Sequence, residues 1–79
     1  MKLWLLTQSD NKRYNTYDSC VVAANTEQEA KEIHPREQDG WKYHRSSWAN
    51  SPETVKAICI GTANDGTNAG LVIASFNAG

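Results

Sequence analysis

Four side chains could ligate a metal ion or act as a nucleophile or base: Cys20, His34, His44 and Cys59. Structural zinc sites usually pair such ligands at C-x-x-C or H-x₃₋₅-H spacing, and this chain has neither pair. The run Asp18-Ser19-Cys20 places a carboxylate beside two nucleophiles, but no histidine lies nearby in the sequence. We interpret this run as a turn, and we expect no metal, with both cysteines reduced and buried.

The known catalytic motifs are also missing from this sequence. It contains no G-x-S-x-G elbow, H-E-x-x-H pair, phosphate loop or dinucleotide fingerprint. Residues 61–70 are rich in glycine, but no Lys-Ser or Lys-Thr pair follows them, so we interpret this segment as a hairpin loop. We therefore expect a protein that is not an enzyme and that has no catalytic residues and no cofactor.

Two segments carry the residue types that dominate protein interfaces, namely aromatic and arginine side chains. The first, residues 11–18, contributes Lys12, Arg13, Tyr14 and Tyr17. The second, residues 36–48, contributes Arg36, Trp41, Tyr43, Arg45 and Trp48. We predict that these nine residues contact a partner. For the second segment, structural aromatic packing, a small ligand and nucleic acid stay as alternatives.

Length and charge limit the classes of partner. A chain of 79 residues with a formal net charge of −1 is one small domain, and its charge attracts neither nucleic acid nor an anionic membrane. Its apolar runs are too short for a membrane span, and its first residues lack the pattern of a signal peptide. We expect a cytoplasmic protein whose thin core favours oligomerisation, for example as a homodimer.

The strongest local pattern is a strand that runs directly into a capped helix. Residues 19–24 are apolar and strand-like, and Thr26 and Glu29 have the spacing of a capping box. The helix is predicted over residues 27–34, because Pro35 disfavours helical backbone at the residue before it. Further strands are predicted over residues 2–8, 55–61 and 71–76.

These elements predict an α+β fold in the order strand, strand, helix, strand, strand. We expect two hairpins in a four-stranded, mainly antiparallel sheet, with one short helix packed on one face. Residues 2–8 are apolar on both faces, which indicates a central strand or one covered by a partner, and Trp4 is expected to be packing. Residues 35–51 lack periodicity but contain several aromatic residues, so we expect a long loop that folds back on the domain. We expect His34 to end the helix, where the helix dipole favours a histidine.

Much of the chain resembles small, mostly uncharacterised α+β proteins of bacteriophages. The resemblance lies in residues 1–8, 14–18, 21–24, 26–30, 33–35 and 74–79. It implies a viral accessory protein in the cytoplasm of a host bacterium. Small phage proteins of this size include inhibitors of host defence, such as anti-CRISPR proteins, which cover a surface of a larger complex.

Three functions follow as hypotheses. The leading one is an inhibitor, similar to anti-CRISPR proteins, that binds a host defence protein or ribonucleoprotein complex through the two segments named above. The alternative is a homo-oligomer that sequesters a small nucleotide signal, with arginines for the phosphates and aromatic rings for the base. A small nucleic-acid-binding regulator is a third hypothesis, which the net charge disfavours.

Overall fold

The computed structural model describes residues 1–77, apart from the side chain of Arg45. Its centre is an antiparallel sheet of four strands in the order β3-β1-β2-β4. The strands are β1 (Lys2–Thr7), β2 (Thr16–Ala24), β3 (Lys56–Thr62) and β4 (Gly70–Asn77). The fold is α+β, and β1 is a central strand, as its two apolar faces predicted.

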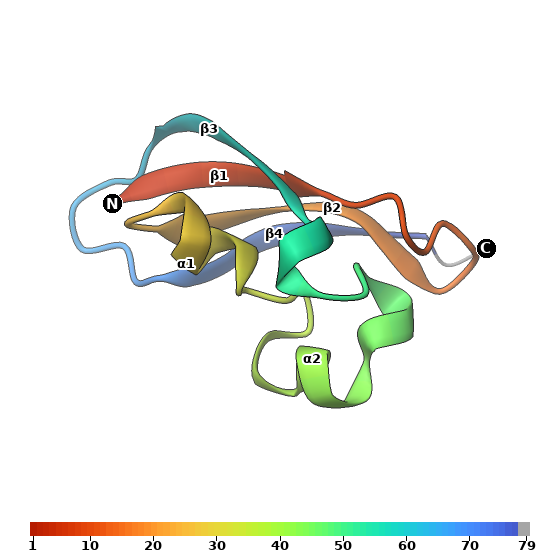
Figure 1. Cartoon of the computed structure of the whole chain (residues 1–79). Coiled ribbons are helices and arrows are strands. Elements are labelled where there is room, and N and C mark those ends of the chain that lie inside the picture. The colour runs from red at the N-terminus through yellow and green to blue at the C-terminus, as the bar shows by residue number, and fades with distance from the viewer. Residues whose placement is uncertain (78–79) are drawn as a thin grey trace.

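The two outer strands lie on opposite sides of the β1–β2 hairpin. β3 pairs with β1, and β4 pairs with β2. The prediction of a second hairpin is therefore wrong. Residues 63–69 instead run from one edge of the sheet to the other, past the open end of the β1–β2 hairpin where the N-terminus lies (Figure 1). Local sequence could not show this, since glycine and asparagine serve a crossing loop as well as a hairpin turn.

Helix α1 (Glu27–Lys31) begins as predicted, with the Thr26 hydroxyl accepting a hydrogen bond from the Glu29 N–H at 3.1 Å. It ends at Lys31, three residues before the predicted end at His34. Glu32 is the C-cap, and the chain then turns so that the side chain of His34 is fully buried. Burial of this ring in the core prevails over the local helical pattern.

The segment from residue 35 to residue 54 contains several short helical turns. They are η1 (Glu37–Asp39), α2 (Gly40–Tyr43), η2 (Arg45–Ser47) and η3 (Pro52–Thr54). These turns and α1 lie on the same side of the sheet (Figure 1). The expectation that this segment folds back with buried aromatic residues is confirmed, because Trp48 is fully buried.

The core lies between this helical layer and one face of the sheet. The buried hydrophobic cluster contains Trp4, Leu6, Cys20, Val22, Ala24, Ala30, Trp48, Ala49 and Val55. Trp4 is core packing, as predicted, and its indole N–H donates to the carbonyl of Ala24 at 3.1 Å. The run Asp18-Ser19-Cys20 is part of β2 and not the predicted turn, although the strand has a bulge between Tyr17 and Ser19.

The opposite face of the sheet, which we call the open face, has no helix against it in the described part of the chain (Figure 1). Leu5 and its cross-strand partners Ile58 and Val21 lie on this face, and Val21 in turn pairs with Ile73. Ile58 and Ile73 are exposed. The sheet therefore has one face packed on the core and one apolar face that is left in solvent.

Candidate binding surfaces

The loop between β1 and β2 is held by one buried side chain, Gln8. Its amide nitrogen donates to the carbonyls of Asn11 and Tyr17, at 2.6 and 2.9 Å. Its amide oxygen accepts from the N–H groups of Asp10 and Asn11. Because one amide satisfies four backbone groups, the loop has a fixed shape. Sequence analysis did not single out Gln8, since its burial depends on partners that only the folded loop supplies.

The same loop is tied to residues 48–54, the last part of the helical segment. The side-chain amide of Asn11 donates to the carbonyl of Trp48 at 2.6 Å. The Asp10 carboxylate accepts from the N–H of Asn50 and from the hydroxyl of Thr54, and these bonds lower the pKa of Asp10 below its usual 3.8. Asp10 is thus engaged in structure at the base of the loop.

Three predicted contact residues project from this supported loop into solvent. Lys12 and Arg13 are exposed, and Tyr14 is 71% exposed. Beside them is a shallow hollow of about 320 Å³ lined by Asn11, Arg13, Tyr14, Asn15, Thr16 and Ser46. We call Lys12, Arg13, Tyr14 and Ser46 the tip patch. No carboxylate lines this hollow in the described structure, so the tip patch has a basic and aromatic character.

Tyr17 is not on this surface, contrary to prediction. It belongs to β2, is half-buried against the core, and its ring centroid lies 4.7 Å from that of Phe76. The bulge between Tyr17 and Ser19 interrupts the alternation of the strand, and it places the Tyr17 side chain on the sheet face that carries the core.

The predicted contact role of Trp48 is wrong, because this side chain is 0% exposed. Trp41 is half-buried and donates from its indole nitrogen to the carbonyl of Glu32 at 2.7 Å. The His34 ring packs edge-on against both indoles, with centroid distances of 5.0 Å to Trp41 and 6.5 Å to Trp48. These aromatic residues stabilise the helical layer, which was one of the alternatives that the sequence left open.

Both ring nitrogens of His34 have hydrogen-bonding partners. Nδ1 accepts from the N–H of Arg36 at 2.9 Å, and Nε2 lies 3.1 Å from the carbonyl oxygen of His44. With Nδ1 as the acceptor, the proton of the neutral ring is assigned to Nε2. Burial lowers the pKa of His34 from 6.5 to about 4, so the ring is neutral at pH 7. The predicted role of His34 at a helix end is wrong, and the residue is part of the core.

The remaining predicted contacts of the second segment lie apart from the tip patch. Tyr43 is 65% exposed, with the ammonium of Lys42 5.2 Å from its ring centroid, and Arg36 is exposed. Neither Arg36 nor Tyr43 lines the hollow beside Tyr14. The side chain of Arg45 lies outside the described structure. Ser46 is the residue through which this segment reaches the tip patch.

The cysteines are both free, but only one is buried as predicted. Burial of Cys20 raises the pKa of its thiol to about 12. Cys59 is exposed, because β3 is an edge strand. Within residues 1–77, no group of three or more histidine, cysteine or acidic residues could hold a metal ion. The described helices include none that is long and apolar enough to cross a membrane.

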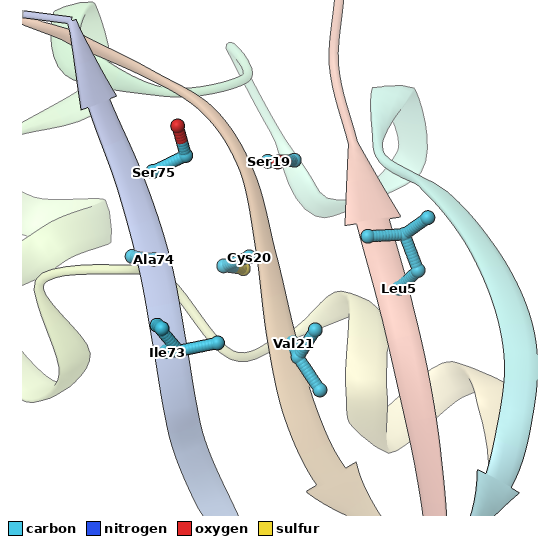
Figure 2. A pocket seen from close by; sticks show the side chains of 7 residues that line it. All are labelled: Leu5, Ser19, Cys20, Val21, Ile73, Ala74 and Ser75. Atoms are coloured by element: carbon cyan, nitrogen blue, oxygen red, sulfur yellow. The ribbon is translucent and has the colours of Figure 1, made fainter.

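A second surface is the open face of the sheet. Leu5, Val21 and Ile73 lie side by side on three adjacent strands, with the helical layer behind them (Figure 2). With Ser19 and Ser75 they line a shallow depression of about 150 Å³. Cys20 and Ala74 complete its lining, which contains aliphatic side chains, two hydroxyls and one thiol but no charged group.

Comparisons with protein-family models, curated proteins and solved structures find no match to this chain.

Proposed function

We propose that this protein is a binding protein, not an enzyme, and that it inhibits a larger protein complex by covering part of its surface. The observation that carries the proposal is the tip patch, a supported loop that exposes Lys12, Arg13 and Tyr14 together. Rigid exposed aromatic and arginine side chains give contact area and directed hydrogen bonds at low entropic cost, as interface hot spots require.

The positions of the reactive side chains support the absence of catalysis in this proposal. His34 is buried with both nitrogens engaged, Cys20 is a buried thiol, and the Asp10 carboxylate accepts two hydrogen bonds at the base of the loop. Each group with a shifted pKa therefore has a structural reason for the shift. His34 and Cys20 do line hollows, but both nitrogens of His34 are hydrogen-bonded within the protein, and the raised pKa of Cys20 keeps its thiol protonated. Neither group therefore offers a free base or nucleophile to a substrate.

The chemistry of the tip patch defines the expected partner. Two cations and a tyrosine, with no carboxylate in the adjacent hollow, fit an acidic surface that also offers an apolar contact for the ring. The resemblance to small phage proteins makes a host defence protein or ribonucleoprotein complex in the bacterial cytoplasm the proposed target.

A pull-down from host lysate at low salt tests this function. Wild-type protein is expected to retain a partner, and the double variant R13A/Y14A is expected to lose it, with at least a 100-fold weaker Kd. The variant I60A is the control, because Ile60 is exposed, is not one of the nine predicted contacts and does not line the tip hollow. Absence of a partner, or equal retention by wild type and R13A/Y14A, would contradict the proposal.

A nucleotide sponge is the second candidate, and the hollow beside Tyr14 favours it. The hollow combines the side chains of Arg13, Tyr14 and Asn15, which suit a phosphate, a base and a ribose. Native mass spectrometry after incubation with a nucleotide extract distinguishes the candidates. A retained small mass that R13A abolishes would favour sequestration over protein contact.

A further inference from the structure

The residues of the open face form three rows that cross all four strands. In strand order β3-β1-β2-β4, the first row is Gly61, Leu3, Ala23 and Gly70. The central row is Ile58, Leu5, Val21 and Ile73, and the third is Lys56, Thr7, Ser19 and Ser75. Because residues paired across strands share a face, each row is a line of neighbouring side chains.

The central row is fully aliphatic and its two ends are strongly exposed, Ile58 at 59% and Ile73 at 65%. An antiparallel sheet with one solvated face normally carries polar side chains there. Here Lys56, at one corner, is the one charged side chain of the three rows. An exposed aliphatic row with one charged side chain near it indicates an interface.

We propose that a second copy of this chain covers the open face, so that two sheets pack face to face as a symmetric homodimer. Sheets packed in this way lie about 10 Å apart, and their inner side chains interdigitate to form a shared core. The inference goes beyond the proposed function, because the tip patch belongs to the loop and not to these rows.

Symmetry supports a second copy as the occupant. In the proposed dimer the two-fold axis lies in the plane of the interface, passes through the middle of the face, and runs either along the strands or across them. In both cases the central row of one protomer falls on the central row of the other, because this row is the middle one of three. Lys56 then faces either Ser75 or Gly61 of the second copy, never its own equivalent. The face is thus complementary to itself without opposing like charges.

The size of the face is consistent with a dimer interface. Four strands about 4.8 Å apart, with about six paired residues each, give a face of roughly 20 by 20 Å before side-chain relief is counted. A standard interface buries about 800 Å² per partner, so this face, about 400 Å² in projection, would make an interface at the small end of the range. A 79-residue chain with its core on one side of the sheet also gains a second core by pairing.

Face-to-face packing is favoured over pairing at the sheet edges. Both outer strands pair irregularly with the hairpin, because the register shifts between Leu3 and Trp4 opposite β3 and between Val21 and Val22 opposite β4. These shifts leave one extra residue in each outer strand, at Ile60 and Val72. Bulges twist an edge strand and hinder its pairing with another chain.

Sedimentation equilibrium of the full chain tests the dimer. Wild-type protein is expected to be a dimer, and I73K and I58K are each expected to raise its dissociation constant by about 100-fold or more, because each would bury an unpaired charge. Both positions are exposed in the single chain, so the monomers are expected to keep their fold by circular dichroism. Y43K, at an equally exposed site of the helical layer, is the control and is expected to dimerise normally.

Mixtures of oppositely charged variants then identify the axis. If the axis runs along the strands, I58K mixed with I73E re-forms a dimer; if it runs across them, I58K mixed with I58E does so. A wild-type chain that is monomeric at its solubility limit would overturn the proposal, as would a dimer that I58K and I73K leave intact. A foreign protein bound to wild type and released by I73K, with no homodimer, would also overturn it. Each result is independent of R13A/Y14A binding.

Discussion

The imidazole of His34 lies directly on the backbone of Gly40. A Cβ atom built on Gly40 would be 2.0 Å from Cγ of His34, far inside van der Waals contact. Gly40 begins helix α2 with ordinary helical backbone angles, so its conformation alone does not require glycine. The contact with the buried ring does.

We predict that G40A destabilises the protein by about 2 kcal/mol or more, although alanine is the better helix former. The clash displaces a ring that is bonded at both nitrogens, so relief requires loss of core contacts. Urea unfolding measures the change. G61A is the control, since a Cβ there meets nothing within 4 Å, and it is expected to change stability little. Equal stability of G40A and wild type would show that the ring moves freely.

Titration of His34 predicts a loss of stability in mild acid. Burial lowers the folded pKa to about 4, below the value of 6.5 for the free side chain. Above pH 6.5 both states are neutral, and between pH 6.5 and pH 4 the unfolded state binds the proton first. Stability therefore falls through this window, by up to about 3 kcal/mol, and no further below it.

Two measurements distinguish the effect of His34 titration on stability from the effects of other titrating groups. In H44Q, NMR follows a single histidine, which is expected to titrate near pH 4. Urea unfolding of the wild type at pH 7 and pH 4.5 is expected to show the loss of stability. Asp10 has a lowered pKa, so its contribution is present above 3.8 and is lost only at lower pH. A His34 that titrates at 6.5 would contradict this prediction.

The two buried indoles provide a third prediction, because they differ in hydrogen bonding. Trp4 donates to the carbonyl of Ala24, whereas Nε1 of Trp48 is buried without a hydrogen-bond partner in the described structure. We expect W4F to lower the free energy of unfolding by about 2 kcal/mol more than W48F does. W4F removes a hydrogen bond, whereas W48F removes a buried donor that has no partner among the described residues. The alanine variants control for packing and are each expected to cost about 3–5 kcal/mol. Equal costs for W4F and W48F would contradict the assignment.

The local elements were predictable from sequence, and their partners were not. The Thr26 cap follows from a short-range pattern and is confirmed, and of the two alternatives for residues 2–8, a central strand or a strand covered by a partner, the central strand is the one observed. The positions of β3 and β4 on opposite edges depend on pairing between residues about fifty positions apart. No local pattern determines that choice, so residues 63–69 were misread as a hairpin.

The candidate surfaces were predictable only in part, for a related reason. Lys12, Arg13 and Tyr14 lie in a polar loop, and such residues stay exposed in most folds. Trp48 is an aromatic residue outside the strands, as Tyr14 is, and only its tertiary contacts bury it. The sequence did contain a signal for the open face, because the apolar residues Ile58 and Ile73 lie next to strand residues that point to the core. Its recognition required the register of the strands.

The crossing of residues 63–69 from one edge of the sheet to the other affects how the chain reaches its native state. The β1–β2 hairpin closes a short loop and can form early, but each outer strand must find a partner that is distant along the chain. Such non-local closure slows folding, and two-state proteins dominated by it fold in milliseconds to seconds. Until both outer strands have docked, the hairpin presents two bare edges, so the unfinished protein is the form most exposed to aggregation.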